Sequence, residues 1–217
     1  RDGLKELFQD IKKISRIKKN DVILDIGAND GTLLKYFKKD KIITIGCEPA
    51  KNLQNELKKN SHYQISDFWH KKQLAKIPEN HRKLKVVTAI GMFYVLEDPT
   101  EFIKHAAEVL DDDGIFVAQL MCTHSMLKTN DLGNICHEHL EYYSYNSLKY
   151  LFEKNGLKIF KISENEINGG SYRIYCKKKL KKSKRIKEKA SLSNIIKFVQ
   201  RVKKNRAETI RFIKKII

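Results

Sequence analysis

The stretch LDIGANDGTLL, Leu24 to Leu34, decides the fold class of this 217-residue chain. It continues a short apolar run and carries glycines at positions 27 and 31, where the backbone can turn tightly and a ligand can approach the amides that begin a helix. A dinucleotide-binding turn would have the spacing GxGxxG, whereas these glycines are four residues apart and an acid, Asp25, precedes the first. The pattern predicts a strand, a ligand-binding turn and a helix that begins near Thr32.

Strand-like and helix-like segments alternate through the rest of the chain. Strands are expected at Val22–Gly27, Ile42–Cys47, Tyr63–Ser66, Lys85–Ile90 and, after a turn at 112–114, Ile115–Leu120. Helices are expected to begin at Thr32, Lys51, Lys71, Thr100 and Asn146. This alternation predicts a parallel α/β sheet covered on both faces. Two last strands, Leu157–Ser163 and Ser171–Cys176, flank turn residues 168–170 and predict an antiparallel hairpin that closes the sheet.

Five parallel strands and a terminal hairpin make a seven-stranded sheet that resembles the class I, Rossmann-like methyltransferases, which use S-adenosylmethionine (SAM). The segment from Asp25 to Gly31 resembles motif I of these enzymes, which implies that the turn passes the amino-acid end of SAM. Glu48, after the second strand, can accept hydrogen bonds from both ribose hydroxyls. Asp67 and Phe68, after the third strand, can supply an acceptor for the adenine amino group and a stacking face. The expected SAM-binding residues are Asp25, Gly27, Ala28, Asn29, Gly31, Glu48, Pro49, Asp67, Phe68 and Gly91.

Composition and hydropathy indicate a globular domain, expected to be cytoplasmic. Hydrophobic residues make up 41% of the chain, and no apolar run approaches the roughly 20 residues that span a bilayer. The first 20 residues are charged throughout and lack the pattern of a signal peptide. The four cysteines have no CxxC spacing, so we expect reduced thiols and no bound metal.

The net charge of +18 is concentrated at the C-terminal end. Residues 177–217 contain 17 of the 44 basic side chains and only 2 of the 26 acidic ones. A basic surface can attract nucleic acid or anionic lipid, but this tail lacks the interleaved aromatics on which bases stack, so nucleic acid is not the expected partner. Apolar residues recur at helical spacing within Ser193–Ile217, which predicts an amphipathic helix that needs a partner surface.

A second informative stretch is ICHEHLEYYS, Ile135 to Ser144, which follows the fifth strand. It is therefore expected at the carboxyl edge of the sheet, where open α/β folds hold their substrates. Together with four other segments, taken in order, it resembles the SAM-dependent C-methyltransferases of deoxysugar biosynthesis, which act on nucleotide-linked 4-keto deoxysugars. The matching segments are Leu24–Leu34, Glu48–Ala50 (EPA), Phe93–Pro99 (FYVLEDP), His137–Ser144 (HEHLEYYS) and Asn168–Tyr175 (NGGSYRIY).

This resemblance implies methylation of a carbon beside a ketone. Such a reaction removes an α-proton and lets the enolate attack the methyl group of SAM, and a histidine suits the role of the base. By resemblance His139 is the base and Glu138 assists it, while Tyr142 is a candidate donor to the enolate oxygen. The residues expected to line the acceptor site are His137, Tyr143 and Arg173.

Other roles remain open for the same side chains. Cys136, His137 and His139 could grip zinc if the segment is extended, although no fourth ligand is evident. The histidines could instead satisfy backbone groups under a loop. One of the two adjacent tyrosines could belong to the core, and Arg173 could pair with a surface acid.

Three positions depart from the sugar-methyltransferase pattern and bear on the acceptor. Val95 and Asn168 stand where the family commonly has histidines, and Cys136 stands where it commonly has a tyrosine. These positions would shape the sugar site. The acceptor can therefore differ from the deoxysugars that the family is known for.

We expect three segments: a helical lead-in at 1–20, a methyltransferase domain at 21–176 and a basic helical connector at 177–217. The resemblance implies an N-terminal zinc-binding segment and a C-terminal Rossmann-like domain in a longer protein. The leading expectation is a C-methyltransferase core with a nucleotide-activated sugar as acceptor. The alternatives are a methyltransferase of another small molecule or RNA, and a module that binds SAM or a partner without transferring a methyl group.

Overall fold

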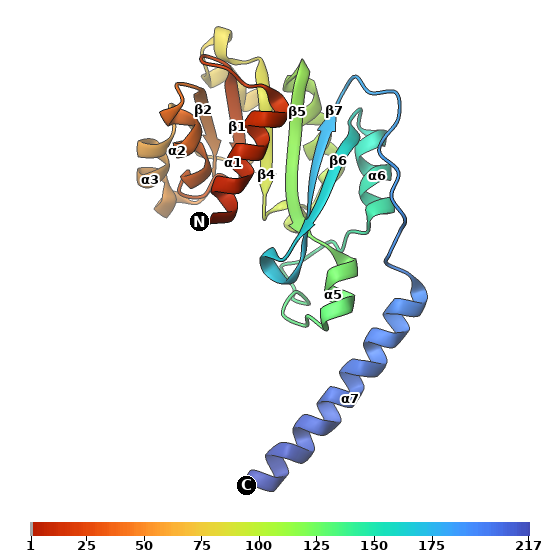
Figure 1. The fold of residues 1–217 in the computed structure, drawn as a ribbon. Helices are drawn as coiled ribbons and strands as arrows, with labels where there is room; N and C mark the ends of the chain where they lie inside the picture. Colours follow the sequence, from red (N-terminus) through yellow and green to blue (C-terminus); the bar gives the residue numbers. More distant parts are fainter. Residues whose placement is uncertain (1) are drawn as a thin grey trace.

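A seven-stranded sheet forms the centre of the computed structural model, which describes residues 2–217 (Figure 1). Arg1, which the sequence assigns to the lead-in, lies outside the described residues. The strands are β1 (Val22–Ile26), β2 (Ile43–Cys47), β3 (Tyr63–Ile65), β4 (Leu84–Ile90), β5 (Leu110–Met121), β6 (Lys158–Asn165) and β7 (Ser171–Lys177). Their order is β3-β2-β1-β4-β5-β7-β6, with the first five parallel and β7 antiparallel to both of its neighbours. The predicted fold class is confirmed.

Helices cover both faces of this sheet. The α-helices are α1 (Asp2–Ser15), α2 (Thr32–Lys39), α3 (Gln54–Asn60), α4 (Pro99–Val109), α5 (Thr123–Thr129), α6 (Tyr145–Lys154) and α7 (Leu192–Ile216). The short 3-10 helices are η1 (Lys51–Leu53), η2 (Lys71–Lys76), η3 (Glu79–His81), η4 (Phe93–Val95) and η5 (Ile167–Gly169). One core cluster joins α4 and α6 to the sheet, and a second joins α1, α2 and α3 to its other face.

The central strand β1 shows why the sequence folds this way. All five of its residues are buried. Alternate side chains point to opposite faces of a strand, so Leu24 and Ile26 join the cluster under α4 while Ile23 joins the cluster under α1 and α2. A continuous apolar run is what a strand covered on both faces requires.

One local expectation was wrong, one was met by a 3-10 helix, and one helix was not predicted. The turn predicted at 112–114 lies within β5, at an irregularity where Leu84 pairs with Leu110 but Val86 pairs with Ile115, so the extra residues bulge out of the ladder. The helix expected from Lys71 is present as the 3-10 helix η2. Helix α5 was not expected, because its seven residues are too few to show a periodic pattern.

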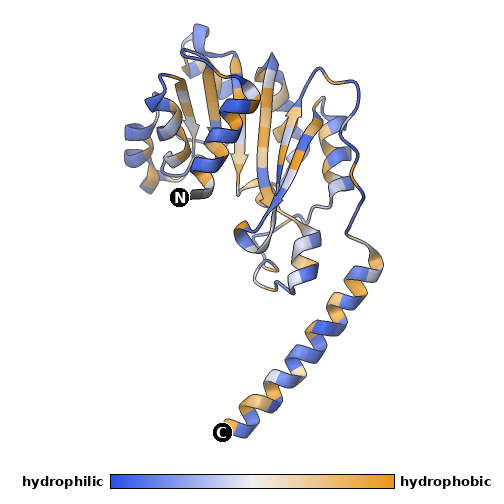
Figure 2. Cartoon of the chain, viewed as in Figure 1, coloured by the Kyte–Doolittle hydropathy of each residue, from blue (hydrophilic) through white to orange (hydrophobic). Residues whose placement is uncertain are grey.

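Within the basic tail, residues 178–191 are not helical, whereas α7 is a long helix that extends away from the sheet (Figure 1). Figure 2 shows hydrophilic and hydrophobic residues alternating along α7, as the sequence predicts. Phe198 is buried against α5, whereas every residue from Lys203 onward is exposed. Among residues 2–217, none of the helices combines the length and the apolar character that crossing a membrane requires.

Candidate functional site

Two cavities meet at Gly27, at the carboxyl ends of β1 and β2. The first, of about 410 Å³, is lined by apolar residues and by carboxylates, among them Ile26, Glu48, Asp67 and Met92. The second, of about 280 Å³, lies on the α1 side of the glycine turn and includes Asp25 and Asn29 in its wall. The carboxyl edge of a parallel sheet is where an open α/β fold binds its ligand.

The glycine turn brings the backbone close to both cavities. Gly27 and Gly31 have φ angles of 71° and 76°, in the left-handed region that favours glycine. A Cβ built on Gly27 would lie 2.9 Å from Cγ of Met92, so a side chain there would narrow the passage between the turn and the segment after β4. The turn predicted from the sequence is present, with Asn29 also at positive φ.

Asp25 lies beneath this turn. Its side chain is 4% exposed, and its Oδ1 accepts a hydrogen bond of 2.6 Å from the hydroxyl of Thr88. Burial raises the pKa of the Asp25 carboxyl to about 7, the Thr88 bond opposes this rise, and the nearby charge of Glu48 adds to it. The carboxyl is thus poised to change protonation near neutral pH, which a cation placed in the adjacent cavity would bias towards the ionised form.

Glu48 links the second strand to the glycine turn. One carboxylate oxygen accepts from the backbone N–H of Asn29 at 3.0 Å, and the other accepts from that of Ala50 at 2.9 Å. A carboxylate oxygen has two lone pairs, so each keeps acceptor capacity towards the cavity. The orientation of the side chain is therefore fixed before a ligand arrives.

The far end of the larger cavity carries the other expected residues. Asp67 accepts bonds from the N–H of Phe68 and from the amide of Gln73, and the ring of Phe68 is 78% exposed. Pro49 lines the same wall. Ala28 lines the smaller cavity, whereas Gly91, at φ 71°, and Gly31 line neither.

The segment around His139 lies against the turn that follows β4. The Nδ1–H of His139 donates to the backbone carbonyl of Asn134 at 2.9 Å, and the hydroxyl of Tyr142 donates to the same oxygen, also at 2.9 Å. A carbonyl oxygen only accepts hydrogen bonds, so this contact assigns the proton of the neutral imidazole to Nδ1. The lone pair of Nε2 is left available for a proton transfer.

Tyr94 lies between this histidine and the larger of the two cavities at Gly27. Its ring lies 4.3 Å from that of His139, centroid to centroid, and its carbonyl accepts from the N–H of Glu141. The next residue, Val95, lines the larger cavity. The short helix η4 therefore separates His139 from that cavity by one turn of backbone. The FYVLEDP segment had been noted in the sequence, but without periodicity no signal singled out Tyr94.

Several expected neighbours of His139 lie elsewhere. The carboxylate of Glu138 is 3.2 Å from Nε2 of His137, and both side chains are largely exposed, so Glu138 does not contact His139 as the resemblance implied. A turn closed by the bond from His139 N–H to the carbonyl of Cys136 replaces the extended segment that zinc binding would need. His137, at 90% side-chain exposure, points to solvent.

Two residues expected in the acceptor site are buried in the body of the domain. Tyr143 is 5% exposed and packs on Phe93 with ring centroids 5.4 Å apart, and burial raises the pKa of its hydroxyl well above the usual range. Arg173 is 2% exposed and forms ion pairs with Glu6 and Asp10 of α1. Neither side chain lines the two cavities at Gly27, and their contacts match the alternatives that the sequence left open, a core position for one of the two tyrosines and an acid partner for Arg173.

A third cavity, of about 640 Å³, lies at the start of β5 and η2, away from the glycine turn. Its wall combines apolar residues, such as Leu74, with basic and acidic ones, such as Lys71, Arg82 and Asp112. It is at the amino end of β5, where parallel sheets do not place their ligands. Size alone therefore does not make it the functional site.

Comparisons with known proteins agree with this geometry. Residues 1–162 match a family model described as a methyltransferase domain. The C-methyltransferase NovU of Streptomyces niveus is 26% identical over 155 residues, which cover 71% of this chain. The aligned region is 37% of NovU, so the chain spans little more than a third of that curated relative.

Solved structures show the same fold. A SAM-dependent methyltransferase from Aquifex aeolicus superposes with a TM-score of 0.57 at 14% identity, over 81% of this chain and 96% of its own. The magnesium protoporphyrin IX methyltransferase of Synechocystis PCC 6803, crystallised with bound S-adenosylhomocysteine (SAH), superposes with a TM-score of 0.61 at 11% identity, over 81% of each chain.

Proposed function

Since the chain belongs to the methyltransferase domain family, we propose that this SAM-dependent methyltransferase is the core of a C-methyltransferase, with a nucleotide-activated deoxysugar as acceptor. The proposed reaction methylates a carbon beside a ketone. The observation that carries the proposal is the contact between His139 Nδ1 and the carbonyl of Asn134, which leaves Nε2 free to act as a base. The naming of its 26% identical relative as a C-methyltransferase supports the choice of carbon as the nucleophile.

The residues at the glycine turn fit SAM. Glu48 is held by two backbone amides with acceptor capacity left for ribose hydroxyls, and the absence of a side chain at Gly27 keeps the passage beside Met92 open. Asp67 and Phe68 would hold the adenine end, and the smaller cavity beside Asp25 would hold the amino-acid end. When bound, SAM supplies an electrophilic methyl group on a sulfonium sulfur.

His139 would take the α-proton of the acceptor on Nε2. The C–H bond breaks, its electron pair enters the enolate, and the imidazole becomes an imidazolium. The carbonyl of Asn134 stabilises that imidazolium through Nδ1–H and holds the ring in one orientation. In this structure the hydroxyl of Tyr142 donates to the same carbonyl, so Tyr142 helps to hold the acceptor group that orients His139. Direct donation to an enolate would require Tyr142 to give up that bond.

Exchange of the acceptor's α-proton with solvent tests the base without requiring methyl transfer. A nucleotide-linked 4-keto deoxysugar is incubated with the chain and SAH in deuterated water, and loss of the α-proton signal is followed by NMR. His139→Gln should slow exchange by about 100-fold or more, the usual contribution of a general base. The matched control is His137→Gln, since His137 is exposed and two residues away. Equal rates for His139→Gln and the wild type would refute the assignment.

The basic tail favours RNA as the second candidate acceptor. Helix α7 has eight basic residues and one acid, and its C-terminal half is exposed. Charge-neutralising substitutions at Lys203, Lys204, Arg206 and Arg211 would reduce RNA binding without affecting SAH binding if RNA is the acceptor.

If SAH binds but neither acceptor is turned over or exchanged, the chain is a SAM-binding module rather than a catalyst.

A further inference from the structure

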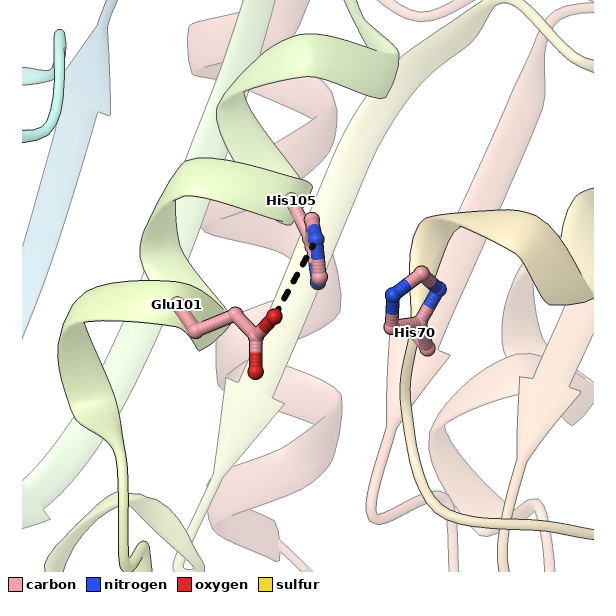
Figure 3. Close-up of side chains that lie close together, drawn as sticks. All are labelled: His70, Glu101 and His105. Carbon is pink, nitrogen blue, oxygen red and sulfur yellow. Dashed lines mark ion pairs between the residues drawn. The ribbon is translucent and has the colours of Figure 1, made fainter.

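Three side chains with metal-binding atoms face one another beside the cavity of about 410 Å³ at Gly27 (Figure 3). His70 precedes η2, and Glu101 and His105 come from α4. One ligand atom from each side chain lies within 4.8 Å of the others. The imidazole rings of His70 and His105 are 4.1 Å apart between centroids, and His105 Nε2 is 3.8 Å from Oε1 of Glu101.

Helix α4 holds two of these groups on one face. Glu101 and His105 are separated by one helical turn, which places their side chains side by side. The start of the helix is fixed by the side chain of Asp98, which accepts from the N–H of Glu101 at 2.8 Å, and Phe102 anchors the helix in the core. The spacing of this pair therefore does not depend on a flexible loop.

His105 is suited to be a ligand because it favours the neutral form. Its side chain is 8% exposed. Burial lowers the pKa of His105, and the nearby His70 lowers it further, whereas Glu101 opposes the change. A metal binds the lone pair of a neutral imidazole.

His70 supplies the third group at a modest cost. Its Nδ1 accepts from the N–H of Lys72, and Figure 3 shows its other ring nitrogen directed towards His105 and Glu101. Coordination through that nitrogen moves the ring proton to Nδ1 and breaks the bond from Lys72. Because that bond is exposed, water can replace it, so its loss costs little.

A hydrogen bond does not account for the arrangement. At 3.8 Å the Glu101–His105 contact, marked as an ion pair in Figure 3, is too long for a hydrogen bond, and Lys71, the nearest cation in sequence, pairs with Glu108 instead. In tetrahedral zinc sites the metal–ligand distances of about 2.0–2.1 Å place neighbouring ligand atoms about 3.3 Å apart. A contraction of well under 2 Å would bring these three groups to that spacing.

We propose that His70, Glu101 and His105 form a site for a divalent transition metal such as Zn²⁺, with water as the remaining ligand. Two imidazoles and one carboxylate are a ligand set that zinc takes in proteins. The metal would join the segment after β3 to α4. Glu101 and His105 also line the cavity of about 410 Å³, so the metal would fix the position of one wall of that cavity relative to the other.

Cobalt titration tests the site without any activity measurement. The whole chain, without an affinity tag, is freed of metal by a chelator and then titrated with Co²⁺. The visible absorption of Co²⁺ bound in a coordination site of low symmetry is recorded. Saturation at one equivalent and displacement by Zn²⁺ are expected. Glu101→Gln and His70→Gln should each weaken binding by at least about 10-fold, since even the loss of an outer partner costs that much.

Glu101→Gln is the decisive variant, because its side chain is 60% exposed and the substitution leaves the core intact. Circular dichroism and thermal unfolding in the presence of chelator check that each variant folds. The control is His81→Gln, a histidine that contacts Tyr63 outside the cluster. Absence of saturable binding, unchanged affinity in Glu101→Gln, or loss of binding in His81→Gln would overturn the proposal.

Discussion

Replacing Asp25 by asparagine measures how strongly the fold retains a proton beneath the glycine turn. Asp25 is 4% exposed, and burial raises its pKa from the usual 3.8 to about 7, opposed by the Thr88 hydrogen bond and helped by the charge of Glu48. Between these two pH values the folded chain keeps the proton while the unfolded chain releases it. The wild type therefore loses stability as the pH rises from about 4 to about 7.

The size of this loss follows from the two pKa values. Each pKa unit corresponds to about 1.4 kcal/mol, so a rise from 3.8 to about 7 amounts to about 4 kcal/mol, all of it expressed above pH 7. Asp25→Asn has no carboxyl to ionise, and its amide oxygen can still accept from Thr88. The free energy of unfolding of the variant, minus that of the wild type, should rise by about 4 kcal/mol between pH 4 and pH 8.

Urea unfolding of both proteins without ligand, at several pH values across this range, gives the difference directly. Glu97→Gln is the control, because Glu97 is exposed and such surface substitutions change stability by no more than about 0.5 kcal/mol. A difference between Asp25→Asn and the wild type that stays level with pH would show that Asp25 is ionised in the fold. A difference that falls with rising pH would show that the fold lowers the pKa of Asp25 instead of raising it.

Three further predictions concern the turn, the base and the tail. Gly27→Ala should weaken SAH binding, measured by calorimetry, by about 10-fold or more. A φ of 71° costs a residue with a Cβ about 1–2 kcal/mol, and the added Cβ would clash with Met92. Unchanged SAH affinity would contradict this prediction. Tyr94→Ala should slow the proton exchange assigned to His139 by about 10-fold or more, because the ring of Tyr94 packs on that of His139, while SAH affinity stays the same. A loss of both exchange and SAH affinity would point instead to collapse of the cavity wall. Phe198→Ala should lower the free energy of unfolding by up to about 3 kcal/mol and speed amide hydrogen exchange in α5, because Phe198 is buried against that helix. Unaltered exchange in α5 would show that α7 does not stabilise it.

The fold was predictable because its signals are local. The run from Val22 to Ile26 is apolar apart from Asp25 and ends at a glycine, and β1 is buried along its whole length. The hairpin was visible because Asn168–Gly170 separates two strand-like runs, and β6 and β7 pair antiparallel there. In each case the residues that determine the element are contiguous.

The surroundings of His139 were less predictable because the loop is irregular. Tyr142 and Tyr143 are adjacent, yet one donates to the carbonyl of Asn134 and the other packs on Phe93. Without a repeating backbone conformation, no period assigns such neighbours to a face. The carbonyl that orients His139 belongs to a main-chain group, which no side-chain pattern can reveal.

The cluster of His70, Glu101 and His105 was missed for a different reason. The sequence predicts no bound metal, and that prediction rests on ligands with short spacings. Here His70 and His105 are separated by β4 and η4, and only the fold brings them together. Of the three, only the pair on α4 has a spacing that a sequence pattern could have flagged.

The basic tail, which the sequence predicts to be a connector, also supports the loop that carries His139. Arg201 donates to the carbonyl of Leu127 and to the side chain of Asn130, at the end of α5, where the loop that carries His139 begins. The other end of that loop is tied to the start of α5, since Thr123 donates to the carbonyl of Tyr143. Because α5 closes the loop at both ends and α7 packs on α5, a chain shortened at residue 176 would lose a support of the proposed base, His139, while keeping the glycine turn. SAH binding and proton exchange should therefore respond differently to that truncation.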